Sequence, residues 1–456
     1  MGTERFGVSR ARVGSVMPET SAEPVVEHAP MGGVERSSAP RYRGTVGYLI
    51  GHFPQSSHTF FYREVCQLRR LGIDVVAIST RAPEGAEAAG GWRADAFAET
   101  VYLDREVRER WGRIVRTFCS KGLPKAILAA LTSEGPPKYR AQSVAWLAHA
   151  AALVGIARDR GFSHVHVGFS ENASQVALLA SRLGGLRYSF TPGHYLFRSG
   201  PNQPAKWRNA AFASSISQFL VDEARGLIGD ANMPPFIEIA PRGVDAEEFK
   251  RTSPYEPWDG VGRLRLFGAS RLTGTKGHLD GMRCLATLRD RGIDVELRIA
   301  GDATDTRYVK CVLDLAEELG VRDRVELLGI IDPAEVRREH ERAHVFLHLA
   351  LEEGLGNAVL EAMAMGTPIV ASGVGGILES VEADVQGILL PPGSPVEAAD
   401  AVERVARDAA LARRMSAAGR DRCVNHYYAT RGAEVVASCL ARIGAVTVDR
   451  GGSGDG

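Results

Sequence analysis

The chain of 456 residues lacks several features that mark specialised classes of protein. It carries 55 basic and 55 acidic side chains, so no net charge attracts a polyanion such as nucleic acid. No apolar run is long enough to cross a bilayer, and none of signal-peptide type opens the chain. The six cysteines are scattered without a Cys-x-x-Cys pair, which favours reduced thiols over disulfides. These absences predict a cytoplasmic protein that does not bind nucleic acid.

A dinucleotide-binding fingerprint is also missing. No Gly-x-Gly-x-x-Gly follows the first expected strand, over residues 45–50. The pattern Gly373-Val-Gly375 comes late in the chain, and no acidic residue stands at the distance expected for a ribose contact. The sequence therefore argues against an oxidoreductase that uses a dinucleotide cofactor.

The order of expected strands and helices predicts two α/β domains. The chain is too long for one ordinary core, and strands alternate with helices in each half, a pattern that predicts a parallel sheet covered on both faces. The first residues are rich in Pro, Ser, Gly and charged residues, so they cannot bury enough surface to order themselves. We expect a disordered tail over residues 1–42, a first domain over 43–250, a linker over 251–262, a second domain over 263–428, a C-terminal helix over 429–446 and a flexible end over 447–456.

Two glutamates, Glu353 and Glu361, mark the most informative segment. An apolar strand is expected over residues 344–350, and a short helix runs from about Asn357 to Gly366 with glycines at its entrance. Backbone N–H groups and the positive end of the helix suit a phosphate group there. One carboxylate lies in the loop and the other one turn into the helix, so they are placed for hydroxyl groups on either side of a diphosphate, as in a nucleotide sugar. The other residues expected at this site are Gly354, Leu355 and Asn357.

Further glycine-containing turns supply cations and backbone donors. Arg271 and Lys276 stand between an expected strand, over residues 263–270, and a helix. A guanidinium fork and a mobile ammonium both suit a diphosphate, although the ordinary alternative is a pair of solvated loop cations. These turns fall at the carboxyl ends of expected parallel strands, where ligands of open α/β sheets bind. The other two turns contain Gly301 and Asp302, and Gly375 and Gly376.

Taken in order, these elements resemble the C-terminal half of the family 4 retaining glycosyltransferases, which have the GT-B fold. The resemblance covers about residues 44–440 and departs from the family at Gly356, where proline is frequent. It implies an α/β protein of two Rossmann-like parallel-sheet domains facing an interdomain cleft, with the C-terminal helix packed back on the first domain. It also implies a nucleoside-diphosphate sugar as donor and retention at the anomeric carbon. By position, Glu361 holds the ribose, Glu353 holds the donor sugar, and Arg271 and Lys276 neutralise the leaving diphosphate.

The N-terminal half resembles bacterial polysaccharide-type members of the same family. Residues 53–60 read Phe-Pro-Gln-Ser-Ser-His-Thr-Phe, so that His58 replaces a glutamate frequent in those proteins. Residues 189–194 resemble a loop in which the family places a histidine near the reacting sugar, although this loop is one residue short. The resemblance makes His194 a catalytic candidate; the alternative is an ordinary hydrogen-bonded histidine. Gly51 is expected on the donor side, and the acceptor-side candidates are Ser57, His58, His166 and His194.

The resemblance implies a hexosyltransferase, and its polysaccharide-type motif favours a cell-surface glycan, such as a lipid-linked one, as acceptor. Because the chain has no Asp-x-Asp motif, we expect no metal cofactor, with the cations of the turns taking the place of a metal clamp. Three alternatives stay open. They are a transferase of a natural-product or small-molecule pathway, a different enzyme on the same fold, and a non-catalytic subunit that binds a nucleotide sugar for an active partner.

Residues 105–118 are a separate feature, expected as one basic amphipathic helix. Trp111 and Phe118 share an apolar face with three aliphatic residues, and five arginines surround it. Such a helix suits the surface of an anionic membrane. The alternative, which we favour from the sequence, is an ordinary helix with a buried stripe and a solvated basic face.

Overall fold

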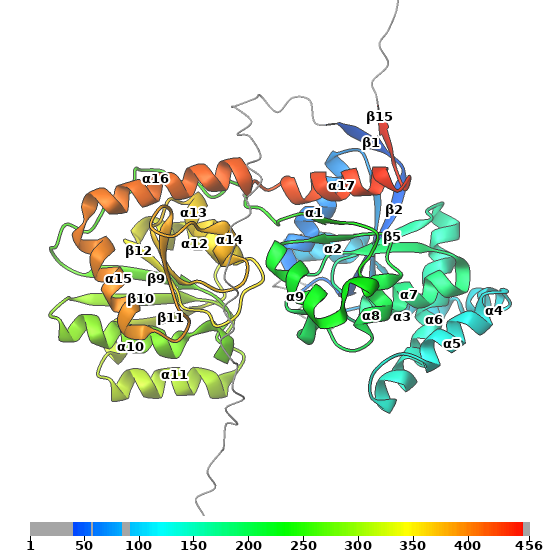
Figure 1. Ribbon diagram of the computed structural model, residues 1–456, viewed down its shortest axis with the longest axis horizontal. Coiled ribbons are helices and arrows are strands. Elements are labelled where there is room, and N and C mark those ends of the chain that lie inside the picture. Colours follow the sequence, from blue (N-terminus) through cyan, green and yellow to red (C-terminus); the bar gives the residue numbers. More distant parts are fainter. Residues whose placement is uncertain (1–39, 56–57, 84–91, 450–456) are drawn as a thin grey trace, which may run out of the picture. The chain divides into compact units, whose positions relative to one another are not determined.

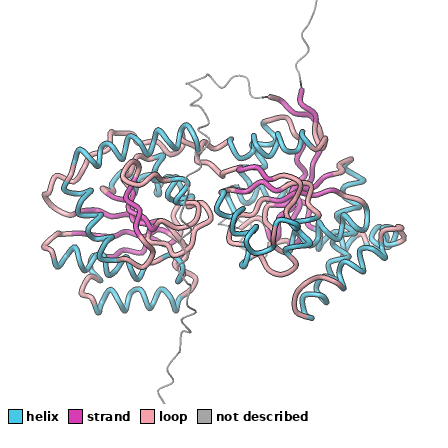
Figure 2. Tube along the Cα trace, in the orientation of Figure 1, coloured by secondary structure: helices cyan, strands magenta, loops and turns pink. Residues whose placement is uncertain are grey.

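The computed structural model describes residues 40–449 apart from residues 56–57 and 84–91. Within this part of the chain lie two parallel β-sheets, one of seven strands and one of six, with their helices (Figure 1). Figure 2 shows the strands of each sheet gathered together with helices around them. The expected fold class, two parallel α/β sheets, is confirmed.

The seven-stranded sheet comes from the first half of the chain, in the order β4-β3-β2-β5-β6-β7-β8. Successive strands run outward from β2 in one direction and from β5 in the other, so the topological switch point lies between β2 and β5. Its strands are β2 (Thr45–His52), β3 (Asp74–Arg81), β4 (Val101–Tyr102), β5 (His164–Val167), β6 (Arg187–Phe190), β7 (Ala213–Ser215) and β8 (Ile237–Ile239). Its helices are α1 (Thr59–Arg70), α2 (Trp92–Glu99), α3 (Leu103–Glu109), α4 (Trp111–Phe118), α5 (Leu123–Leu131), α6 (Pro137–Arg160), α7 (Asn172–Gly184), α8 (Gln203–Arg208) and α9 (Gln218–Ile228).

Apolar side chains alternate between the two faces of this sheet. On β2, Leu49 joins one core cluster, whereas Tyr48 and Ile50 join the cluster on the other face. The first cluster takes side chains from α6 and α7, and the second takes them from α1 and α17 (Arg431–Arg442). The C-terminal helix therefore packs beside the first helix of the chain.

The six-stranded sheet comes from the second half, in the order β11-β10-β9-β12-β13-β14. Its switch point lies between β9 and β12, so the loops that follow these two strands emerge side by side. Its strands are β9 (Leu264–Ala269), β10 (Val295–Ala300), β11 (Val325–Gly329), β12 (Val345–His348), β13 (Ile369–Ser372) and β14 (Gly387–Leu390). Its helices are α10 (His278–Asp290), α11 (Thr306–Glu318), α12 (Pro333–Arg342), α13 (Asn357–Ala364), α14 (Ile377–Ser380), α15 (Pro395–Arg407) and α16 (Ala409–His426).

Segments associated with the first sheet hold the loop before α13 in place. Leu355 is buried in one cluster with Ile216 and Leu220. The Ser217 hydroxyl donates to the Gly354 carbonyl oxygen over 2.7 Å. The Glu379 carboxylate accepts the first backbone N–H groups of α9, so it caps that helix.

The ends of the described chain correct two expected boundaries. Residues assigned to the terminal tails form β1 (Arg41–Arg43) and β15 (Thr447–Asp449), which pair antiparallel. Tyr42 is buried in the cluster that contains α1 and α17, and this burial, together with backbone pairing, orders both segments. The rest of the tails lies outside the described residues.

The segment over residues 105–118 also differs from expectation. Instead of one helix it forms α3 and α4, which are separated at Arg110, with φ −123° and ψ 41°. The break lies two residues before Gly112, whose flexible backbone weakens a continuous helix. As a result, Trp111 begins a new helix. Among the described helices, none combines the length and apolar character that crossing a membrane requires.

Candidate active site

The turn between β9 and α10, residues 270–277, is called here the Lys276 turn. It begins at the switch point of the six-stranded sheet. Gly277 takes a left-handed conformation, with φ +70°, just before α10. A Cβ atom there would lie 1.8 Å from the carbonyl oxygen of Leu349, so only glycine fits. This close approach holds the Lys276 turn against the segment that leads to Glu353.

We expect Gly277→Ala to lower the free energy of unfolding by about 3 kcal/mol or more, because it adds a backbone clash to the cost of a left-handed non-glycine residue, about 1–2 kcal/mol. Gly292 is the matched control, since its φ is +80° and an added Cβ would meet nothing within 4 Å. Urea unfolding of both alanine variants measures the difference. Equal losses would contradict the close approach.

Lys276 and Glu353 meet at this place. The Lys276 ammonium forms an ion pair with Oε1 of Glu353, and His348 Nε2 lies 3.0 Å from the same oxygen. Burial by itself would raise the pKa of Glu353, but the hydrogen bond with His348 and the charge of Lys276 outweigh it and hold the pKa at about 2. The carboxylate therefore stays ionised at neutral pH and can accept hydrogen bonds from hydroxyl groups.

The glycine pair at 375–376 closes over the backbone of Glu353. Gly375 has φ +53°, and a Cβ atom there would lie 1.7 Å from the Glu353 carbonyl oxygen. At Gly376 a Cβ atom would lie 2.3 Å from the carbonyl oxygen of Gly354. The structure thus brings together Lys276, Glu353 and the glycine pair.

Arg271 and Gly301 lie on the β10 side of the same turn. A Cβ atom at Gly301 would lie 1.9 Å from the carbonyl oxygen of Ser270, and Leu272 N–H donates to the Asp302 carbonyl oxygen over 2.8 Å. The Arg271 side chain is exposed and makes no ion pair with the described residues. The guanidinium is thus accessible at the rim of the turn.

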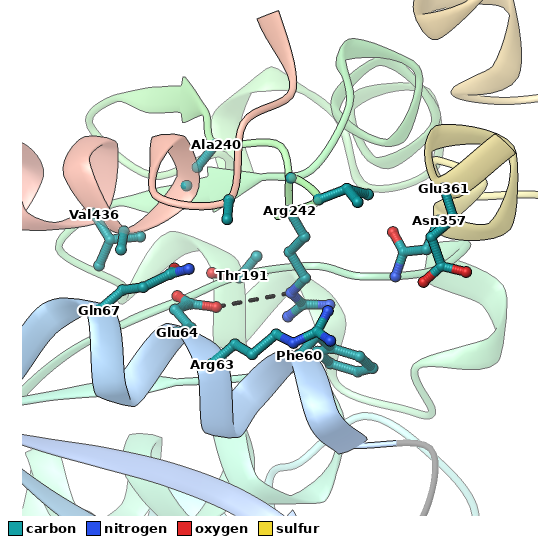
Figure 3. A pocket seen from close by; sticks show the side chains of 15 residues that line it. Phe60, Arg63, Glu64, Gln67, Thr191, Ala240, Arg242, Asn357, Glu361 and Val436 are labelled. Carbon is teal, nitrogen blue, oxygen red and sulfur yellow. Dashed lines mark ion pairs between the residues drawn. The ribbon is translucent and has the colours of Figure 1, made fainter. Parts of the chain in front are cut away.

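Glu361 and Asn357 face a different pocket (Figure 3). They project from successive turns of α13 toward Arg63 on α1 and Arg242 after β8. Burial raises the pKa of Glu361 to about 7; the charge of Arg63 opposes this shift and that of Glu248 adds to it. This carboxyl group therefore changes its charge near neutral pH.

Arg242 is a residue that the sequence analysis missed. Its side chain is 10% exposed, its guanidinium stacks on the ring of Phe60 at 4.2 Å, and its Nε lies 3.7 Å from Glu64. That Nε is buried and has no hydrogen-bond partner. Arg242 closely follows β8 in the residues Pro241 to Asp245, so its position after a strand end was the available signal.

His194 forms a pair with a second missed residue, Glu171. His194 Nε2 lies 2.7 Å from Glu171 Oε1, and Nδ1 lies 3.1 Å from the carbonyl oxygen of Tyr195. Burial would lower the pKa of His194, but these two acceptors outweigh it and raise the pKa above its ordinary value. Glu171 comes after β5 at the switch point of the first sheet, which was the signal for it.

The remaining candidates of the first sheet occupy different surroundings. His166 is fully buried and hydrogen-bonds Ser189 and Thr191, so its interpretation as an acceptor residue is corrected to a core residue. Burial lowers the pKa of His166 to about 3 and that of His58, which precedes α1, to about 4. The Gly51 carbonyl oxygen accepts from Ser79 and Thr80 at the end of β2. Ser57 lies outside the described residues.

Comparison with known proteins identifies the family of the chain. The family described as glycosyl transferases group 1 matches residues 262–422. A GDP-mannose-dependent alpha-(1-6)-phosphatidylinositol monomannoside mannosyltransferase of Mycobacterium tuberculosis is 30% identical over 268 residues, which cover 55% of this chain and 69% of that protein. The chain belongs to the group 1 glycosyltransferases.

Two further relatives match over shorter stretches. An uncharacterized glycosyltransferase of Methanocaldococcus jannaschii is 36% identical over 146 residues, 32% of this chain and 36% of that protein. A 2-deoxystreptamine glucosyltransferase of Streptomyces kanamyceticus is 29% identical over 195 residues, 43% of this chain and 48% of that protein. The matched region thus spans less than half the length of each of these two relatives.

Solved structures share the fold. A glycosyltransferase of Rickettsia africae superposes with a TM-score of 0.65 at 16% identity, covering 88% of this chain and 98% of that one. The Anabaena protein HepE, crystallised with UDP and glucose, also has a TM-score of 0.65, at 17% identity, covering 88% of this chain and all of that one. The fold is therefore that of these GT-B proteins.

Proposed function

We propose that the chain transfers a sugar from a nucleoside-diphosphate sugar to an acceptor hydroxyl with retention and without a metal ion. The observation that carries this proposal is the largely buried Lys276–Glu353 pair, closed in by Gly375 at the switch point of the six-stranded sheet. A fixed cation beside an ionised carboxylate suits a diphosphate next to sugar hydroxyls. In this proposal residues 263–428 hold the donor, and residues 43–250 hold the acceptor.

Each candidate residue has a role in the proposal. Lys276 and Arg271 stabilise the charge that develops on the leaving diphosphate, and the backbone N–H groups of the glycine pair add donors. Glu353 accepts hydrogen bonds from the donor sugar, and Glu361 accepts them from the ribose. His194 lies on the acceptor side, where it contacts the transferred sugar.

For the acceptor we propose a growing cell-surface glycan or glycolipid. The polysaccharide-type motif at residues 53–60 supports it, and so does the relative that acts on a phosphatidylinositol monomannoside. A small-molecule acceptor is the second candidate, favoured by the likeness to a 2-deoxystreptamine glucosyltransferase. We place the reaction in the cytoplasm, because all six cysteines are free thiols.

Incubating the purified chain with UDP-, GDP- and dTDP-sugars tests the proposal. We expect one donor to raise the melting temperature and to be hydrolysed slowly, with release of the nucleoside diphosphate. EDTA is expected to leave this rate unchanged. Stabilisation without turnover, even with acceptors present, would point to a non-catalytic binding subunit, and dependence on magnesium or manganese would overturn the metal-free reaction.

We expect Glu171→Gln to reduce kcat about tenfold, because the imidazole of His194 loses a charged hydrogen-bond partner. A histidine whose folded-state pKa is raised stabilises the protein at low pH and loses this contribution as pH rises through that pKa. Glu171→Gln should therefore be less stable than wild type below the ordinary histidine pKa, about 6.5. Well above that pH the difference in stability should be smaller. If kcat is unchanged, and the stability difference between variant and wild type does not depend on pH, then Glu171 does not position His194.

A further inference from the structure

Helix α5 has its small and large apolar residues in unusual places. Ala126 and Ala130 are buried, whereas Ile127, Leu128 and Leu131 point outward. Leu128 is 62% exposed and Leu131 is 54% exposed. A helix that packs only within its own protein buries its large apolar side chains and not its alanines. The outer face of α5 is thus unexplained by packing inside the chain.

Apolar side chains of the neighbouring helices continue this face. Both α4 and α5 pack on α6 (Figure 1), and Phe118, Leu123 and Ile127 line a shallow apolar groove together with residues 144–148 of α6. The break at Arg110 starts α4 at Trp111, which is 56% exposed. Single exposed apolar residues are common, but a groove lined by apolar side chains of three helices indicates an interaction site. We define the apolar–basic surface by its exposed apolar residues and by the exposed cations of the same segment, which are described next. The apolar residues are Trp111, Val115, Ile127, Leu128, Leu131 and Val144.

Residues 110–145, which carry this surface, are also strongly basic in a chain without net charge. Residues 110–145 contain seven Lys and Arg residues and one acidic residue, Glu134. Arg113 is paired with Asp159 and Arg110 with Glu106. Five other cations are exposed and make no ion pair within the described part of the chain: Arg116, Lys121, Lys125, Lys138 and Arg140.

We propose that the apolar–basic surface docks on an anionic phospholipid bilayer. Exposed leucines insert at the headgroup boundary, a tryptophan prefers that boundary, and unpaired lysines attract anionic lipids. A second copy of the chain fits less well, because an isologous contact would bring two sets of like charges together. A protein partner also fits less well, because lysine is depleted at protein interfaces. The proposal is independent of the transfer reaction.

Co-sedimentation of the full chain with vesicles tests this inference. We expect binding to vesicles of phosphatidylcholine and phosphatidylglycerol, weakened by salt, and little binding to phosphatidylcholine alone. Lys121→Glu with Lys125→Glu should weaken binding by about tenfold or more, and Leu128→Ser with Leu131→Ser by about tenfold. Trp111 fluorescence should shift to shorter wavelength on binding, and Trp111→Phe should remove that shift.

Two matched controls keep the test specific. Lys250→Glu with Lys310→Glu makes the same change in net charge at other exposed lysines, and Leu227→Ser removes an equally exposed leucine on α9. Both controls should bind as wild type does, and all variants should keep the wild-type melting temperature. Equal binding to both vesicle types, or full binding by the α5 variants, would overturn the proposal. So would a dimer that the leucine substitutions on α5 dissociate.

Discussion

Lys276→Ala is expected to reduce transfer by about a hundredfold to a thousandfold, the usual loss when one preorganised group facing transition-state charge is removed. The loss has two causes in this structure. The variant lacks the cation that would face the leaving diphosphate, and it removes the charge that balances the Glu353 carboxylate, whose remaining partner among the described residues is His348. An incoming diphosphate would then meet a negative charge. Steady-state kinetics with the identified donor measures the effect.

A double variant separates charge balance from catalysis. Removing one partner of a largely buried ion pair costs about 3 kcal/mol of stability, so Lys276→Ala alone should be destabilised. Adding Glu353→Gln should restore much of the stability and none of the activity. Because the folded-state pKa of Glu353, about 2, lies below its ordinary 4.5, the pair stabilises the protein above pH 4.5 and loses this contribution as pH falls toward 2. Wild-type turnover by the single variant would remove Lys276 from the reaction.

Glu361→Gln is expected to weaken donor binding by about 10- to 100-fold, because in the proposed complex the ribose would lose hydrogen bonds to a charged acceptor. The pH dependence identifies the cause. With a pKa of about 7, the wild-type carboxyl group is increasingly protonated below neutrality, so donor affinity should fall about tenfold per pH unit there. The affinity of the glutamine variant should not change over this range. Titration calorimetry at several pH values measures both.

Stability provides an independent check on Glu361. Its folded-state pKa lies above the ordinary value of 4.5, so its contribution is fully present below pH 4.5 and is lost as pH rises through about 7. The stability of Glu361→Gln relative to wild type should therefore increase as the pH rises from 5 to 8. Glu318→Gln, at an exposed position on α11, serves as the control and should show no such trend. A flat difference for Glu361→Gln would contradict its burial in the pocket.

Residues that follow strand ends were predictable from the sequence. Arg271, Gly301, Glu353 and Gly375 each follow an apolar run that reads as a strand, and parallel strands place their carboxyl ends along one edge. The structure adds the ion pair between Lys276 and Glu353, because it depends on the adjacency of β9 and β12. No local pattern encodes that adjacency.

The features that could not be predicted from the sequence depend on contacts between segments that are distant along the chain. Glu171 pairs with His194 across 23 residues, and β1 pairs with β15 from the other end of the chain. His166 was an acceptor-side candidate from the sequence, but its side chain points into the core toward Ser189 and Thr191. Glu353 and Glu361, eight positions apart, were expected on either side of one diphosphate, and the structure directs Glu361 into the pocket with Arg242.

A crystal structure of the chain with its nucleoside diphosphate bound tests the central claim most directly. We predict that diphosphate oxygens lie within hydrogen-bonding distance of Lys276 Nζ and of the backbone N–H groups at the glycine pair, with the ribose at Glu361. A diphosphate bound instead between Arg63 and Arg242, away from the Lys276 turn, would contradict it.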